Sequence, residues 1–220
     1  KSNLQLDAIL ITHWHPDHTG GIMDLVIDTK VLNNTSNAES ANILASEIID
    51  AKLKLKGWND KCNSWILKVE FVSRCFPEFE IPQFTDADKL LVLTDFCEGA
   101  LTYKEIKDKQ CWPYLEKWLS PIHYQTVKQY APDRIKLENG IEAKVLYTSN
   151  GPKISIVLQK LYDVNITPLL CNGKIPVPIE VLGPNHRPVQ TTTDISRFWK
   201  ESYPDIKKQL KGRYPKHEWR

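Results

Sequence analysis

The sequence predicts an α+β protein, in which a helical first half is followed by a small hairpin-rich β region and a C-terminal helix. Three observations support this: apolar residues at helical spacing over residues 38–131, alternating runs from residue 132, and an Asn-Gly pair between two such runs. Helices bring apolar residues three or four positions apart onto one face, whereas strands do so at every second position. We therefore divide the chain into residues 1–34, 38–131 and 132–220.

The helical part carries two clear patterns and several shorter ones. Apolar residues recur at helical spacing at Ile43, Leu44, Ile48 and Leu55, and again at Trp65, Val69, Val72 and Phe76. Ser36 or Asn37 is a candidate cap for the first helix. A break is expected between Pro77 and Pro82, and further short helices over residues 90–96, 114–119 and 123–130.

The β part is built around Asn139-Gly140, which separates the alternating residues 134–138 and 141–145 and predicts a hairpin. Residues 154–162 fit either a helix or a strand. Residues 174–182 and 187–193 fit strands. Asp194 is a candidate cap for a last helix over residues 195–210, broken near its middle by Pro204.

Composition excludes several classes of protein. The net charge is +2, so any nucleic-acid signal must be local. No apolar run approaches the roughly 18 residues of a membrane-spanning helix, and residues 1–7 lack the apolar stretch of a signal peptide. The five cysteines are odd in number and form no CxxC pair, which favours reduced thiols in a cytosolic or organellar protein. We expect a cytoplasmic location.

The sharpest chemical feature is a histidine cluster behind a short apolar run. Residues 8–12 read as a buried strand, and the sequence His-Trp-His-Pro-Asp-His follows directly at residues 13–18. Imidazole nitrogens and carboxylate oxygens suit Zn²⁺, and Gly20 and Gly21 permit tight passage of the backbone beside such a site.

Residues 11–22, Ile-Thr-His-Trp-His-Pro-Asp-His-Thr-Gly-Gly-Ile, resemble the first metal motif of the metallo-β-lactamase superfamily. The resemblance implies that His13 and His15 bind one zinc ion and that Asp17 and His18 bind a second. It covers about 30 residues. The strands that precede this motif in the family, and its later ligands, have no match here, because His123, His186 and His217 stand in other contexts.

The C-terminal tail is locally basic. From Lys200 to Arg220 there are seven Lys or Arg against three Asp or Glu, interleaved with Tyr203, Tyr214 and Trp219. Basic groups neutralise phosphates and aromatic rings stack on bases. The alternative is a solvated basic helix whose aromatic residues pack into the protein's own core. The candidate nucleic-acid-binding residues are Arg187, Lys207, Lys211, Arg213, Tyr214 and Lys216.

The same tail is similar to the end of the HrpB family of DEAH-box ATP-dependent helicases. The similarity rests on Arg-Pro-Val-Gln at residues 187–190, Phe198-Trp199, Tyr203-Pro204 and the run Lys-Gly-Arg-Tyr-Pro-Lys-His-Glu-Trp at residues 211–219. It extends backward, more weakly, to Ala38. Lys160 departs from the family, which usually has Glu there.

This resemblance implies an accessory region beside a helicase motor, with single-stranded nucleic acid or a DEAH-box motor as partner. By analogy, the hairpin-rich part is OB-like. The 220 residues contain neither a GxxxxGK[ST] phosphate loop nor an Asp-Glu-Ala-His box, so we expect no ATP site in them.

Two alternatives remain. One is a zinc-dependent hydrolase of the metallo-β-lactamase superfamily, acting on an ester, thioester or phosphodiester. The other is a chain without a joint function, in which a rearrangement or a faulty gene prediction joined two fragments near the polar residues 33–37.

Overall fold

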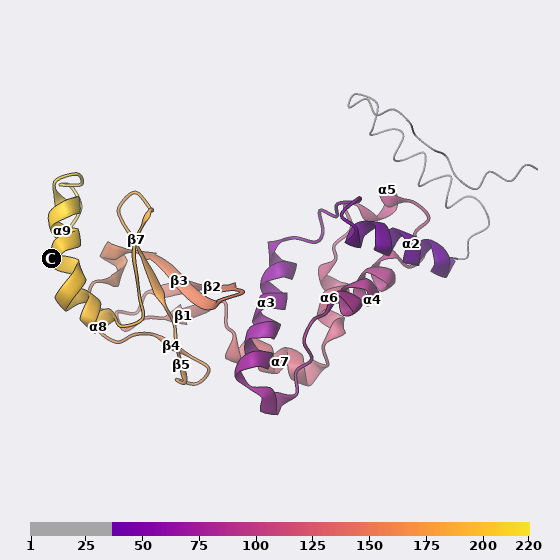
Figure 1. The fold of residues 1–220 in the computed structure, drawn as a ribbon, viewed down its shortest axis with the longest axis horizontal. Helices are drawn as coiled ribbons and strands as arrows, with labels where there is room; N and C mark the ends of the chain where they lie inside the picture. Colours follow the sequence, from indigo (N-terminus) through magenta and orange to yellow (C-terminus); the bar gives the residue numbers. More distant parts are fainter. Residues whose placement is uncertain (1–36) are drawn as a thin grey trace, which may run out of the picture. The chain divides into compact units, whose positions relative to one another are not determined.

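The computed structural model describes residues 37–220, which form parts of two compact units (Figure 1). The described part of the first unit is residues 37–58 and 86–114, and the second unit is residues 59–85 and 115–220. Helices dominate up to residue 130, and strands and a C-terminal helical stretch follow. The predicted α+β class is therefore confirmed.

In the first unit, helix α2 (Asn37–Ile49) packs against helix α4 (Asp86–Cys97) through buried Leu44 and Phe96. Helix α2 ends because Ala51 is left-handed (φ 59°), and the Lys52 N–H bonds back to the Glu47 carbonyl, 3.1 Å away. The prediction that Leu55 continues the helical pattern is therefore wrong. Leu55 is buried, but it lies in the loop that follows the helix. The predicted caps, Ser36 and the Asn37 side chain, lie outside what the structure describes.

That loop is fixed by close main-chain contacts within the unit. The Tyr103 hydroxyl, on the short helix α5 (Tyr103–Ile106), donates to the Lys54 carbonyl at 2.6 Å. At Gly57 an added Cβ would lie 2.0 Å from the Lys109 carbonyl oxygen, so only glycine fits. Helix α6 (Trp112–Trp118) then leads into the second unit.

The second unit begins with helix α3 (Asp60–Cys75), whose Asn59 side chain caps it by accepting from the Lys61 N–H. Trp65, Val69 and Val72 are buried, as their spacing predicts. The break predicted between Pro77 and Pro82 begins with the 3₁₀ turn η2 (Pro77–Phe79). Helix α7 (Pro121–Tyr130) begins after Ser120, whose side chain caps it by accepting from the His123 N–H.

Five strands form one sheet in the order β1-β2-β3-β6-β7, in which β3 and β6 are parallel and all other neighbours are antiparallel. The strands are β1 (Arg134–Lys136), β2 (Glu142–Thr148), β3 (Gly151–Val157), β6 (Ile179–Leu182) and β7 (Pro188–Thr192). Val145, Ile154 and Ile179 are buried on the inner face. Helix α3 covers that face at β2, where the rings of Phe71 and Tyr147 lie 5.6 Å apart.

The predicted hairpin at Asn139-Gly140 is confirmed as β1 and β2. Only Gly140 has a positive φ (83°), and its N–H bonds to the Leu137 carbonyl, which describes a type I turn with a glycine bulge. The Asn139 amide donates to the carbonyls of Lys160 and Tyr162, at 3.0 and 2.8 Å. The loop is thereby attached to the turn that follows β3.

Two segments that were each predicted as one element turn out to be composite. Residues 154–162 contain the end of β3 and then the 3₁₀ turn η3 (Leu158–Leu161). Residues 174–182 were predicted as one strand but form two. β5 (Ile175–Pro176) pairs with β4 (Leu169–Leu170), and β6 joins the main sheet. Pro176 and Pro178 lack the N–H that a continuous central strand needs.

The chain closes with one continuous helical stretch made of α8 (Ile195–Arg197), the π-helical η4 (Phe198–Ser202) and α9 (Tyr203–Lys211). The Asp194 carboxylate caps it by accepting from the Arg197 N–H, as predicted. The break expected near Pro204 takes the form of the π segment just before it, because proline removes one helical hydrogen bond. No helix in the described part is long and apolar enough to cross a membrane.

Candidate nucleic-acid interface

The inner side of the C-terminal helical stretch is an aromatic cluster. Phe198 and Tyr203 are buried, and their rings meet the half-buried Trp199 at 5.0 Å each. The Trp199 indole N–H donates to the Val164 carbonyl at 2.7 Å. Tyr162 completes the cluster, with its hydroxyl 3.1 Å from that of Tyr203. These rings fix the stretch against the end of η3.

The same two tyrosines hold the end of the chain. The Tyr162 hydroxyl donates to the Glu218 carbonyl at 2.9 Å, and the Tyr203 hydroxyl donates to the Arg220 main-chain oxygen at 2.8 Å. The Arg220 guanidinium lies over the Tyr162 ring and bonds to the Asp163 carboxylate at 2.6 Å. Residues after α9 therefore fold back onto the unit at fixed positions.

Burial and hydrogen bonding act on the ionisation of these groups. Burial, followed by hydrogen bonding with the Tyr162 hydroxyl, raises the pKa of Tyr203, so its phenol stays protonated and able to donate to the Arg220 main-chain oxygen. Hydrogen bonds to Glu218 and then Asp163 raise the pKa of Arg220 further above its ordinary value. Neither group is available as a free charge for a partner.

The predicted basic residues separate into two kinds. Lys211, Arg213 and Lys216 are exposed, and none of them forms an ion pair with any residue that the structure describes. Lys207 is half-buried and donates to the Arg220 main-chain oxygen at 2.7 Å, so it helps to hold the tail. Tyr214 is half-buried as well, and its carbonyl accepts from the Trp219 indole at 2.9 Å.

Arg187, although distant in sequence, belongs to the same end of the unit. It closes the turn between β6 and β7, where the Gly183 N–H bonds to the Arg187 carbonyl at 2.9 Å. A Cβ on Gly183 would lie 3.7 Å from the Leu210 side chain, so this turn packs against the end of α9. Arg187 is exposed and unpaired within the described residues. The structure thus brings Arg187 toward Lys211 and the residues that follow it.

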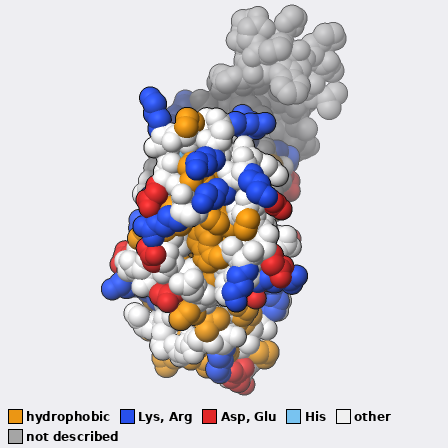
Figure 2. Space-filling model, turned by 90° about the vertical axis from the view of Figure 1, so that its left-hand side faces the viewer, with side chains coloured by type: hydrophobic (Ala, Val, Ile, Leu, Met, Phe, Trp, Pro, Cys, Tyr) orange, Lys and Arg blue, Asp and Glu red, His pale blue; other side chains and the backbone are white. Residues whose placement is uncertain are grey.

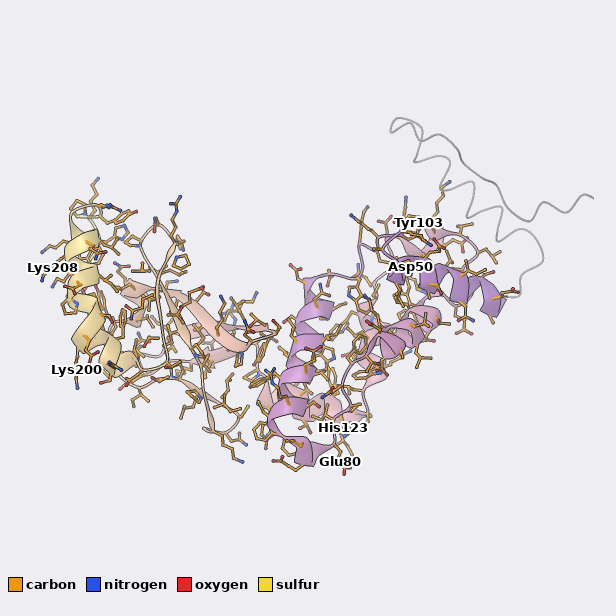
Figure 3. The ribbon with its side chains drawn as sticks, viewed as in Figure 1. Asp50, Glu80, Tyr103, His123, Lys200 and Lys208 are labelled. Atoms are coloured by element: carbon orange, nitrogen blue, oxygen red, sulfur yellow. The ribbon has the colours of Figure 1, made fainter. Side chains whose placement is uncertain are left out.

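Sequence reasoning did not single out two further cations on this surface, Lys200 and Lys208. Figure 3 shows both on the outer side of the helical stretch, pointing away from the sheet. Lys208 lies 3.7 Å from Asp205, whereas Lys200 has no such partner among the described residues. Figure 2 faces this side of the molecule and shows more Lys and Arg than Asp and Glu side chains over its upper half. A sequence signal for these two lysines was available, because their helical spacing places Lys200 and Lys208 away from the buried Tyr203 and Ile206.

The predicted metal ligands, His13, His15, Asp17 and His18, lie outside the described residues. Within residues 37–220, no group of three or more His, Cys, Asp or Glu side chains is placed to hold a metal ion. The donors of the N-terminal motif itself, three imidazoles and one carboxylate, are a set that suits Zn²⁺.

Comparison with known proteins assigns these regions. A family model described as ATP-dependent helicase C-terminal matches residues 92–220, and one for the metallo-beta-lactamase superfamily matches residues 1–33. The ATP-dependent RNA helicase HrpB of Escherichia coli (strain K12) is 26% identical over 203 residues. That match covers 90% of this chain and 25% of the helicase. The lactamase-like protein nscB of Arthroderma gypseum is 35% identical over 51 residues, which is 23% of this chain and 16% of that protein.

Two solved structures have the same fold over most of the chain. The crystal structure of E. coli DExH-box NTPase HrpB superimposes with a TM-score of 0.71 and that of Escherichia coli DEAH/RHA helicase HrpB with 0.63. Each is 25% identical and covers 86% of this chain but 24% of the helicase. The chain thus spans about a quarter of the length of its helicase relative. Because the helicase model matches more than half of its residues, the chain belongs to the ATP-dependent helicase C-terminal family of HrpB, and a metallo-β-lactamase-like segment precedes this region.

Proposed function

We propose that the C-terminal region binds single-stranded nucleic acid, RNA in the first instance, as an accessory region of a DEAH-box helicase motor. The observation that carries the proposal is a group of exposed cations, Arg187, Lys211, Arg213 and Lys216, at one end of the second unit, none of which forms an ion pair with a described residue. A relative with 26% identity is named as an ATP-dependent RNA helicase, which favours RNA over DNA.

The physical basis of the proposal is electrostatic. A cation without an acidic partner is free to neutralise a phosphate, and the release of condensed counterions then makes binding strongly salt-dependent. The anchored tail adds to this, because Arg213 and Lys216 lie between α9 and the clamped Glu218 and need little ordering when a ligand binds. Guanidinium groups add bidentate contacts to phosphate oxygens.

The motor would be supplied by residues other than these 220, in the same polypeptide or in a partner protein, because no phosphate loop or DEAH box occurs among them. We also propose a cytoplasmic location. This is supported by the five cysteines, the buried Cys97 and Cys111 among them, because none of the five forms a disulfide. Burial raises the pKa of the Cys97 thiol to about 12, which keeps it protonated and unreactive.

The test is binding of a fluorescent oligouridine of about 12 nucleotides, measured by anisotropy over a series of salt concentrations. The variant Lys211→Ala/Arg213→Ala/Lys216→Ala should bind more weakly and lower the slope of log K against log salt by about two, at roughly 0.7 per phosphate contact. The matched control is Lys54→Ala/Lys107→Ala/Lys117→Ala, which removes three charges from other elements. Equal binding by the two variants, or no binding by the wild type to RNA or to a DEAH-box motor, would refute the proposal.

We propose, as a second function, that His13, His15, Asp17 and His18 bind Zn²⁺, on the support of the superfamily match over residues 1–33. When bound in such sites, zinc acts as a Lewis acid that activates water for hydrolysis. Metal analysis of the purified chain by mass spectrometry is the test. One or two zinc ions per chain, lost in His13→Ala/His15→Ala, are expected. A metal-free wild type would leave the segment without this function.

A further inference from the structure

The outer face of the sheet carries a second group of cations, at β1 and β2. Side chains of directly paired residues point to the same face, and Arg134 pairs with Lys144 while Lys136 pairs with Glu142. Neighbouring Ile135 and Ala143 point to the other face, where Ala143 is buried. Arg134, Lys136 and Lys144 are all exposed, so this end of the outer face is open to solvent.

The pair Arg134 and Lys144 is unfavourable for the isolated protein. Directly opposite residues on antiparallel strands have Cβ atoms about 5 Å apart, and like charges at such positions destabilise the sheet. Neither side chain forms an ion pair with any residue in the described part of the chain. The adjacent pair, Lys136 and Glu142, has opposite charges and the favourable arrangement.

Two acidic side chains in this part of the sheet, Asp133 and Glu180, bond to other groups. Asp133 precedes Arg134, yet its carboxylate accepts from the buried Lys68 of α3, at 2.7 Å, on the inner side of the sheet. Glu180 of β6 lies on the outer face but accepts from Lys153, at 3.0 Å, and from Ser155. Among the described residues, no carboxylate forms an ion pair with Arg134 or Lys144.

We infer that Arg134 and Lys144 bind a backbone phosphate of the single strand whose other phosphates contact the tail cations. The inference rests on the proposed function and extends its surface from α9 onto the sheet. A phosphodiester supplies the missing negative charge, with the planar guanidinium of Arg134 making paired hydrogen bonds and Lys144 acting as a point charge. Glu142, which pairs with Lys136 and lies two residues before Lys144 on the same face of β2, limits the site on that side.

The two basic regions are close enough for one strand to contact both. From β2 to β6 the sheet has two steps of about 4.8 Å, and from Glu180 to the turn at Gly183 the chain advances about 10 Å. The β6–β7 turn that carries Arg187 is thus within a few nucleotides of Lys144. Nucleic-acid-binding sites of about 4 to 16 nucleotides are common for small β domains.

The test combines binding with stability in Lys144→Glu, which converts the like-charge pair into an opposite-charge pair. We expect a higher melting temperature together with an oligouridine affinity about fivefold to tenfold lower, since one phosphate contact is replaced by repulsion. Lys117→Glu makes the same change of charge at an exposed position of α6 and should alter neither. Unchanged affinity in Lys144→Glu would overturn the inference.

Three further measurements keep the result decisive. If Lys144→Glu does not fold, Arg134→Gln/Lys144→Gln removes both charges and should lower the salt slope by about one to two. If inorganic phosphate at constant ionic strength stabilises the wild type through these residues while RNA affinity does not depend on them, the site takes free anions and the inference fails. The proposed function fails only if the variants of Lys211, Arg213 and Lys216 also bind RNA with normal affinity. Normal binding by the Arg134 and Lys144 variants alone overturns the inference and leaves the proposed function in place.

Discussion

The two sides of the C-terminal helical stretch have opposite roles. Its inner side places Phe198, Tyr203 and Ile206 in the core, where the Tyr203 ring contacts the rings of both Phe198 and Tyr162. Its outer side presents Lys200 and Lys211 to solvent without ion pairs to described residues. Aromatic and basic residues alternate along one segment of sequence, yet the fold separates them, so Tyr203 and Phe198 serve stability and leave the cations for a partner.

The largest expected effect is on the inner side. Phe198 is 1% exposed, and Phe198→Ala should reduce the free energy of unfolding by about 3–5 kcal/mol, through lost burial and the cavity left behind. Lys200→Ala, two positions away on the outer side, should change it by less than about 0.5 kcal/mol. Urea denaturation of both variants measures the difference. Similar values for the two would contradict the separation of roles.

On the outer side, the large effect should be on binding. Lys211→Glu/Arg213→Glu/Lys216→Glu should weaken oligouridine binding by roughly tenfold to a hundredfold, because repulsion replaces three phosphate contacts. The melting temperature should stay near that of the wild type, since the three side chains are exposed and make no ion pairs with described residues. A variant that binds normally, or that unfolds, would show that these cations are not a free surface.

Tyr162→Phe should affect both stability and RNA binding, each by an intermediate amount. It keeps the ring but removes the hydroxyl that bonds to Tyr203 and to the Glu218 carbonyl, which should cost about 1–2 kcal/mol. The tail that carries Arg213 and Lys216 should then be less ordered. Hydrogen exchange of the tail should increase, and affinity should fall by a smaller factor than in the triple variant. Faster hydrogen exchange with unchanged affinity would show that the order of the tail does not contribute to RNA binding.

The smallest expected effect concerns pH. A hydrogen bond from Ser155, followed by one from Lys153, lowers the pKa of Glu180 below its ordinary value of 4.5. A carboxylate with a depressed pKa stabilises the fold above that ordinary value, and this contribution is lost as pH falls through the folded-state pKa. Glu180→Gln should therefore differ from the wild type in unfolding free energy at neutral pH, and the difference should shrink as the pH falls below 4.5. A constant difference would contradict the assignment.

Local signals in the sequence were sufficient for most of the fold. The cap at Asp194, the helical spacing of Trp65, Val69 and Val72, and the Asn139-Gly140 turn all depend on residues close in sequence. Predictions failed where distant contacts decide. Leu55 is buried outside any helix, and residues 174–182 split between two sheets, because their partners in space cannot be read from spacing.

The candidate interface was likewise predictable from the sequence only in part. The excess of positive charge after Lys200 is visible in the sequence, but which cations are free depends on tertiary contacts. Lys207 and Arg220 are used to fix the tail, whereas Lys211 is not. The register that sets Arg134 opposite Lys144 follows from the hairpin turn, so a sequence signal for that pair did exist.

The most direct test of the account is the salt dependence of oligouridine binding by the wild type and by Lys211→Ala/Arg213→Ala/Lys216→Ala. The account predicts a steep linear fall of log K with log salt for the wild type and a slope smaller by about two for the variant. Parallel lines for the two proteins would contradict it, because the cations that follow α9 would then not contact phosphate.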